Sequence, residues 1–160
     1  MKQNKYDDNV FFQKYSQMDR SVKGLEGAGE WKTLERLLPD FRDRHVLDLG
    51  CGFGWHCRYA AEHGAASVLG VDISAKMIAK ARSMGNEGII EYRCMPMEDI
   101  LLPEASFDIV LSSLAFHYTP DFQAVCRNVS RWLKPEGAFI FSVEHPVFTA
   151  QGTQDWHYDE

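Results

Sequence analysis

Three glycines on alternate positions, with an aspartate just before them, form the most chemically informative stretch of the sequence. Gly50, Gly52 and Gly54 follow the run 46–49, which contains Asp48. A buried strand that ends in a glycine turn and a helix start lets the backbone come close to a ligand. Dinucleotide-binding turns are spaced G-x-G-x-x-G and hold a pyrophosphate, which the Asp48 carboxylate would repel. The spacing G-x-G-x-G therefore favours a ligand that carries a positively charged group.

A second carboxylate lies at the end of the next apolar run. Asp72 follows residues 67–71 and comes 22 positions after Gly50. At the carboxyl end of a strand, its oxygens can accept hydrogen bonds from the hydroxyl groups of a ribose. A capping or turn aspartate is the alternative, and the preceding glycine turn makes the nucleoside role the favoured one. Together, the two carboxylates indicate a nucleoside ligand with a cationic tail.

Two histidines could act as a general base if the reaction removes a proton from its substrate. His117 and His145 each follow the end of a predicted strand, and Pro146 fixes the chain after the second histidine. A histidine with a packing or turn role is the alternative at both positions. His56 and His63 have no partners at metal-ligand spacing, so we expect no metal site.

The pattern of the whole chain predicts the scaffold that brings these residues together. Apolar runs typical of strands alternate with helical segments and lie at residues 46–49, 67–72, 89–94, 107–112 and 138–143. This alternation predicts an α/β fold with a Rossmann-like, doubly wound parallel sheet of about five strands in the order 3-2-1-4-5. In such a sheet, ligands bind at the carboxyl ends of the strands.

Helices are predicted between the strands and before the first one. Ser74 is a typical N-cap, and residues 119–121 are typical of a helix start, with Thr119 as the cap. Residues 1–40 place apolar side chains on helical faces, so we expect a helical N-terminal cap. Within it, Tyr15 either packs against the rest of the protein or belongs to a lid over the ligand pocket.

Length and composition are those of one ordinary globular domain. The 160 residues are 45% hydrophobic and 25% charged, and 17 basic and 23 acidic side chains give a formal net charge of −6. This balance does not favour a nucleic-acid partner, and no apolar stretch approaches membrane-spanning length. The four cysteines are far apart and the first residues lack the apolar run of a secretory signal. We therefore expect free thiols in a cytoplasmic protein.

In its ordered set of motifs, the sequence resembles the class I methyltransferases that use S-adenosylmethionine, in their small-molecule branch with a methyltransferase type 11-like domain. The resemblance covers about residues 30–148 and rests on residues 46–56 (VLDLGCGFGWH), 70–74 (GVDIS), 97–99 (MED), 106–118 (SFDIVLSSLAFHY) and 133–142 (LKPEGAFIFS). It implies S-adenosylmethionine as cofactor, S-adenosylhomocysteine as product and a small molecule as methyl acceptor. It also implies that residues 41–148 are the cofactor-binding core.

Carried over position by position, the resemblance implies a set of cofactor contacts. The glycine turn would pack against the methionyl part, Asp48 would help to hold its amino group, and Asp72 would bind the ribose. Pro96 stands where family members often carry an acid, so Glu98 is the substitute near the adenine edge. The implied set is Asp48, Gly50, Cys51, Gly52, Asp72, Ile73, Met97, Glu98, Ser113 and Leu114. We expect Tyr15 of the predicted lid to contact the cofactor as well.

The family's sheet has two further strands, and the sequence predicts no sixth or seventh strand. We therefore expect residues 1–160 to be a single methyltransferase domain that is an N-terminal fragment of a longer protein, or a homo-oligomer that covers the exposed fifth strand. A non-catalytic module that binds S-adenosylmethionine is the main alternative function. An NAD-dependent dehydrogenase is a third one, disfavoured by the glycine spacing and by Asp48.

Overall fold

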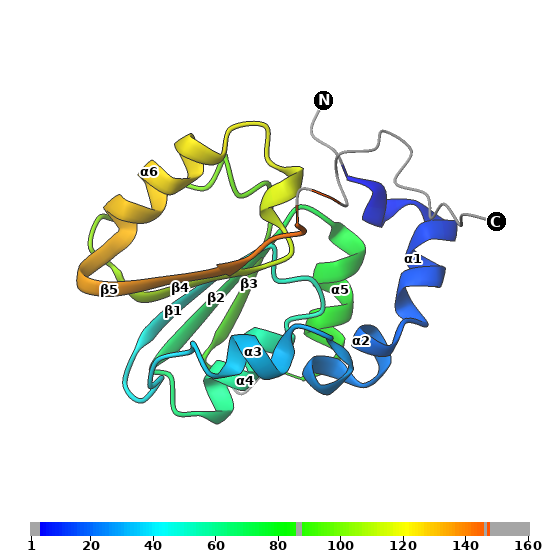
Figure 1. The fold of residues 1–160 in the computed structure, drawn as a ribbon, viewed down its shortest axis with the longest axis horizontal. Coiled ribbons are helices and arrows are strands. Elements are labelled where there is room, and N and C mark those ends of the chain that lie inside the picture. The colour runs from blue at the N-terminus through cyan, green and yellow to red at the C-terminus, as the bar shows by residue number, and fades with distance from the viewer. Residues whose placement is uncertain (1–3, 86–87, 146, 148–160) are drawn as a thin grey trace.

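A computed structural model describes residues 4–85, 88–145 and 147 and contains a five-stranded parallel sheet with helices on both faces (Figure 1). The strands are β1 (His45–Leu49), β2 (Ser67–Asp72), β3 (Ile90–Cys94), β4 (Phe107–Ser113) and β5 (Leu133–Ser142). Their order, β3-β2-β1-β4-β5, and their parallel pairing confirm the predicted fold.

The helices within the described residues precede the sheet or connect its strands. They are η1 (Lys5–Asp7), α1 (Asn9–Ser16), α2 (Asp19–Val22), η2 (Gly24–Gly27), α3 (Trp31–Glu35), α4 (Trp55–Glu62), α5 (Ala75–Ser83), η3 (Phe116–Tyr118) and α6 (Phe122–Trp132). None of these helices is both long and apolar enough to cross a membrane.

The sheet is buried on both faces, which explains the continuous apolar runs of its central strands. On one face, Val46 of β1 shares a core cluster with Cys57 of α4 and residues of α5. On the other face, Leu47 lies in a cluster with Trp132 and other residues of α6. Figure 1 accordingly shows α6 on the opposite side of the sheet from α3 and α4. The two layers hold the strand ends in place on the edge where the predicted site residues lie.

One predicted helix cap is confirmed and one is wrong. The Ser74 hydroxyl accepts a hydrogen bond from the Met77 backbone N–H at 3.1 Å and caps α5. At α6, however, the cap is Asp121, whose carboxylate accepts from the Ala124 N–H at 2.8 Å, whereas Thr119 ends η3 in an extended conformation. Both residue types cap helices well, and the charged group nearer to the helix makes the bond.

The last strand begins earlier than the predicted residues 138–143. β5 starts at Leu133, immediately after α6, because Leu133 already pairs with Phe107 of β4. The turn signals of residues 135–137 form an irregularity inside the strand, where the pairing register shifts and Glu136 has a φ of 64°. Pairing with a neighbouring strand thus extends β5 through a sequence that, taken alone, predicts a turn.

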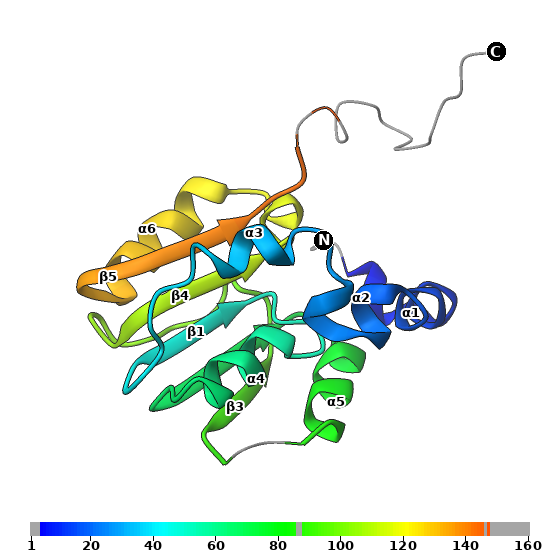
Figure 2. The same cartoon turned by 60° about the horizontal axis from the view of Figure 1, so that its bottom comes forward.

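The N-terminal segment lies beside α5, over the carboxyl ends of the strands (Figure 2). Phe12 and Tyr15 of α1 meet the ring of Phe53 edge-on, with ring centroids 5.9 and 5.8 Å apart. Asp7 accepts hydrogen bonds from the Ser74 hydroxyl at 2.5 Å and from the Lys76 backbone N–H at 3.2 Å. The segment is therefore fastened both to the glycine turn and to the start of α5.

Candidate functional site

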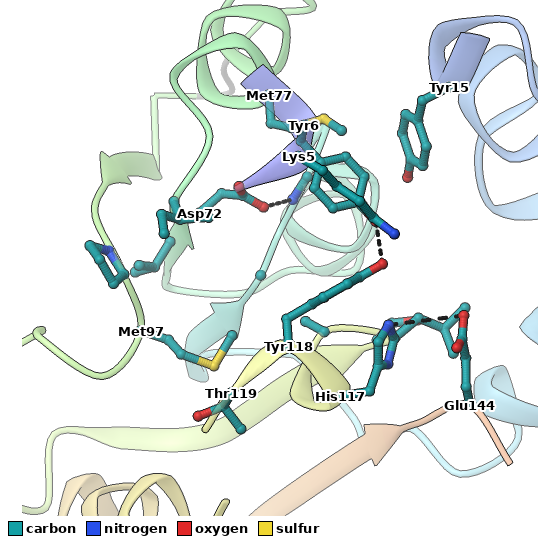
Figure 3. Close-up of a pocket in the computed structure, with 18 of the residues that line it drawn as sticks. Lys5, Tyr6, Tyr15, Asp72, Met77, Met97, His117, Tyr118, Thr119 and Glu144 are labelled. Atoms are coloured by element: carbon teal, nitrogen blue, oxygen red, sulfur yellow. Dashed lines mark hydrogen bonds and ion pairs between the residues drawn. The ribbon is translucent and has the colours of Figure 1, made fainter. Parts of the chain in front are cut away.

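A cavity of about 300 Å³ lies at the carboxyl ends of β1, β2 and β4, under the N-terminal segment. Figure 3 shows side chains from the N-terminal segment, the strand ends and the loops that follow them around this cavity. Ten of the predicted site residues line the cavity: Tyr15, Gly50, Gly52, Asp72, Ile73, Met97, Glu98, Ser113, Leu114 and His117. Asp48, Cys51 and His145 do not line it.

The glycine turn presents backbone to the cavity, because both of its lining glycines adopt a positive φ that favours glycine. Gly50 has a φ of 76°, and a Cβ built on it would lie 2.3 Å from the Cβ of Ala115. Gly52 has a φ of 53°, and a Cβ there would meet no atom within 4 Å. The space in front of Gly52 is open, so a ligand can approach its backbone closely.

The Asp72 carboxylate is fixed at the end of β2 by two backbone donors. Its Oδ2 accepts from the Gly52 N–H at 2.9 Å and its Oδ1 from the Ser74 N–H at 2.8 Å. Burial raises the pKa of Asp72, and these two hydrogen bonds oppose that rise. Each oxygen keeps a further lone pair, so the carboxylate can accept hydrogen bonds from two adjacent hydroxyl groups of a ligand.

Asp48 lies behind the glycine turn rather than in the cavity. Its side chain is 1% exposed and accepts a hydrogen bond from the Cys57 thiol at 3.3 Å. Burial raises the pKa of Asp48 to about 7. The thiol of Cys51 is buried as well, and burial raises its pKa to about 11. The implied contacts of Asp48 and Cys51 with a cofactor therefore stay predictions.

Ile73, Met97 and Glu98 form the wall next to Asp72, together with the preceding Pro96. We call Gly50, Gly52, Asp72, Ile73, Met97 and Glu98 the cofactor side of the cavity. The apolar side chains of Ile73 and Met97 can cover a flat aromatic ring, while Glu98 adds a polar group beside them. This wall agrees with the predicted adenine contacts, whose individual roles stay predictions.

Several lining residues were not predicted from the sequence: Lys5, Tyr6, Arg20, Tyr118 and Glu144. The hydroxyl groups of Tyr6 and Tyr118 are 3.1 Å apart, and burial raises the pKa of Tyr6. The clustered aromatic residues of the N-terminal segment were a usable signal for a cavity wall. Their partner Tyr118 lies 112 positions away in the sequence, so no local pattern connects them.

The two predicted general bases have different surroundings. His117 lines the cavity, and its Nε2 lies 3.9 Å from Oε1 of Glu144. Burial lowers the pKa of His117, while the Glu144 charge raises it and the Lys5 charge lowers it further. His145 is exposed, and its Nδ1 accepts a hydrogen bond from the Val147 N–H at 3.2 Å. Of the two histidines, the geometry brings only His117 next to the cavity.

A parallel sheet of this order, with a glycine turn after β1 and a carboxylate after β2, defines the Rossmann-like class of nucleoside-binding proteins. The family described as a methyltransferase domain matches residues 47–141. The chain belongs to this family, which includes S-adenosylmethionine-dependent methyltransferases.

Three similar proteins illustrate the relationship. An uncharacterized protein of Haemophilus influenzae is 37% identical over 90% of this chain and 59% of its own length. A ubiquinone biosynthesis O-methyltransferase of Neisseria meningitidis is 32% identical over 84% of this chain and 69% of its own length. The crystal structure of a candidate S-adenosylmethionine-dependent methyltransferase from Listeria monocytogenes superposes with a TM-score of 0.78 and 53% identity, over 82% of this chain and 62% of that one. The chain thus spans about three fifths of the Haemophilus and Listeria proteins.

Proposed function

We propose that the chain binds S-adenosylmethionine in this cavity and transfers its methyl group to a small-molecule acceptor. The observation that carries the proposal is the Asp72 carboxylate, fixed between the N–H groups of Gly52 and Ser74. It lies beside a turn whose backbone is open to a ligand at Gly52. A nucleoside with an extended tail fits this arrangement, because the carboxylate can accept hydrogen bonds from a ribose and the open backbone leaves room for the tail.

The chain offers a group for each part of the cofactor. Asp72 would accept hydrogen bonds from the ribose hydroxyls, and Ile73 and Met97 would cover the adenine. Gly52 would let the methionyl tail pass close to the backbone. Arg20 lines the cavity, and one nitrogen of its guanidinium donates to Glu30 at 2.7 Å. Its other N–H groups can bind the carboxylate of the tail.

When bound, S-adenosylmethionine supplies a methyl group that is already activated for transfer. The work of the protein is then to orient the acceptor and to exclude water. The N-terminal segment supports this role because Tyr6, Phe11 and Tyr15 line the cavity on the side away from the sheet. The name of the Neisseria relative supports a small-molecule acceptor as well.

Methyl transfer from labelled S-adenosylmethionine to a metabolite extract tests the proposal. The expected result is label in a small molecule, lost in a chain that carries Asp72→Ala. Binding of the cofactor with no labelled product would instead support the non-catalytic binding module. Both functions need the cofactor side, and only the first needs a bound acceptor.

We also propose a cytoplasmic location and a second copy of the chain at the free edge of β5. The four cysteines are free, which supports a reducing compartment. β5 is the last strand of the described sheet, and Phe141 and Val143 near its end are exposed. Light scattering after size-exclusion chromatography would detect the dimer, and a monomer at micromolar concentration would exclude it.

A further inference from the structure

Among the charged residues that line the cavity, Arg20 belongs to neither of its two sides. Asp72 and Glu98 are part of the cofactor side. The other charged residues belong to a group that takes no part in the proposed cofactor contacts and is left for the acceptor. This group is Lys5, Tyr6, His117, Tyr118 and Glu144, which we call the acceptor side and which Figure 3 shows across the cavity from Met97. The surroundings of Arg20 therefore need an explanation of their own.

The Arg20 guanidinium is held by a carboxylate that does not itself line the cavity. Its Nη2 donates to Oε1 of Glu30 at 2.7 Å, and the two side chains are 29% and 26% exposed. Arg20 is part of the cavity wall, whereas Glu30 is not. Glu30 can thus reach a ligand in the cavity through the groups that it holds in place.

The backbone of Glu30 is fixed at the start of α3. Its carbonyl oxygen accepts from the Leu34 N–H at 3.0 Å, and the next residue, Trp31, is 2% exposed. The Trp31 ring meets the Tyr59 ring of α4 edge-on, with ring centroids 4.8 Å apart. A carboxylate on such an anchored backbone is a rigid partner for the long, flexible side chain of an arginine.

The carboxylate of Glu30 is also fixed by hydroxyl groups at the ends of β4 and β5. The Ser113 hydroxyl donates to the same Oε1 at 3.3 Å, because a carboxylate can only accept. Ser113 Oγ then accepts from the Ser142 hydroxyl, 3.1 Å away, and Ser142 Oγ accepts from the Leu114 N–H at 3.2 Å. Leu114 lines the cavity with a φ of 51°, in the left-handed region. One chain of hydrogen bonds therefore connects Arg20 to this part of the wall.

The nearby His56 does not compete with Arg20 for the carboxylate. Burial lowers the pKa of His56 to about 4, although the Glu30 charge opposes that shift. At neutral pH the imidazole is therefore uncharged. Within the described parts of the chain, Arg20 is the one cation that forms an ion pair with Glu30.

We propose that Glu30 is a positioning residue for the amino-acid tail of the cofactor, because it holds the Arg20 guanidinium in the orientation that binds the carboxylate of the tail. This inference rests on the proposed function and adds to it a residue outside the cavity wall. A guanidinium that is already held at one nitrogen loses less rotamer freedom when a ligand binds to its other N–H groups. Glu30 would in this way strengthen tail binding without touching the tail.

A direct contact of Glu30 with the ammonium group of the tail is the competing role. Two features favour positioning. Glu30 does not line the cavity, and its Oε1 uses both lone pairs on Arg20 and Ser113. The two roles predict different responses to a ligand that has the ammonium group without the carboxylate.

Calorimetry with two ligands tests the role of Glu30 without turnover. S-adenosylhomocysteine carries the whole tail, and its decarboxylated analogue keeps the ammonium group but lacks the carboxylate. Glu30→Ala should weaken S-adenosylhomocysteine about three- to fivefold and leave the analogue within about twofold. Glu30→Gln keeps an acceptor for Arg20 and Ser113, so it should restore binding to within about twofold of the unmodified chain. Glu26→Gln is the matched control, because Glu26 is exposed on η2 and does not line the cavity.

A double-mutant cycle tests whether Glu30 acts through Arg20. In a chain that carries Arg20→Met, the further change Glu30→Ala should leave the affinity for S-adenosylhomocysteine unchanged, because no guanidinium remains to be positioned. Additive losses would overturn the inference, because Glu30 would then act on the ligand by another route.

The outcomes separate this inference from the proposed function. Equal weakening of both ligands by Glu30→Ala would overturn the positioning of a carboxylate-binding group. Weakening of both ligands by Glu30→Gln would assign Glu30 to the ammonium group and overturn the inference as well. If Glu30→Ala binds S-adenosylhomocysteine as tightly as the unmodified chain, the inference fails and the proposed function stands. An unmodified chain that does not bind S-adenosylhomocysteine would contradict the proposed function itself.

Discussion

The cofactor side of the cavity is built from backbone and from residues close in sequence, whereas the acceptor side is assembled from side chains of three distant segments. Asp72 is fixed by two backbone N–H groups at 2.8 and 2.9 Å. On the acceptor side, Tyr6 reaches Tyr118 through one hydroxyl contact, and Glu144 lies 3.9 Å from His117. A site built from backbone suits a ligand that is the same in every reaction, such as a cofactor. A site built from side chains can change with the substrate. We therefore expect substitutions on the cofactor side to cause large losses of stability or of cofactor binding. Substitutions on the acceptor side should affect only particular ligands.

The largest effect is expected where the glycine turn has no room. Gly50→Ala places a Cβ 2.3 Å from that of Ala115 at a φ of 76°, so overpacking and backbone strain add. We expect the free energy of unfolding to fall by about 2–5 kcal/mol in urea denaturation. Gly85→Ala is the control with strain alone, because its φ is 95° and its Cβ would meet no atom within 4 Å. Equal losses for the two variants would mean that the turn is not tightly packed.

Asp48, buried behind the glycine turn, should make the stability of the folded chain sensitive to pH. Its folded pKa, about 7, is above the usual value near 4 for an unfolded aspartate. The folded state therefore binds a proton that the unfolded state releases, and stability is lost as the pH rises from about 4 to 7. Asp48→Asn should remove this loss and stabilise the chain by about 2–4 kcal/mol at pH 8, with little effect at pH 4. A stability difference that is constant with pH would contradict the buried, proton-binding carboxylate.

Asp72→Ala should weaken the binding of S-adenosylhomocysteine by about 1–3 kcal/mol in calorimetry, because the ribose hydroxyls lose their acceptor. Asp40→Ala is the control, since Asp40 pairs with Arg42 outside the cavity. If the two variants bind equally well, Asp72 does not hold the ribose.

The smallest effect should distinguish the two ends of the cofactor. Arg20→Met should weaken S-adenosylhomocysteine by about 1 kcal/mol, because the Arg20 guanidinium is partly exposed and already paired with Glu30. It should leave methylthioadenosine unaffected, because that ligand has the nucleoside but no amino-acid tail. Competition binding with both ligands measures the difference. Equal weakening of both would place Arg20 at the nucleoside or give it a structural role.

The cofactor side could be predicted from the sequence because its signals are local. The apolar run, the alternate glycines and Asp72 follow one another within 27 residues, from 46 to 72. The burial of Asp48 could not be predicted in the same way. It depends on how α4 packs, since the thiol of Cys57 is what reaches the carboxylate.

The acceptor side could be predicted only in part. His117 was expected because it follows a strand end, whereas Lys5 and Tyr6 join this side by contacting the neighbouring Tyr118, more than a hundred residues away in the sequence. The early start of β5 had the same kind of cause, because Leu133 joins the strand by pairing with Phe107. Contacts between distant segments decided each of these features, and no local pattern encodes them.

Calorimetric titration of the chain with S-adenosylhomocysteine and, separately, with NAD tests the central claim most directly. The G-x-G-x-G turn and Asp72 predict saturable binding of S-adenosylhomocysteine at one site and no binding of NAD. Binding of NAD without binding of S-adenosylhomocysteine would contradict the account.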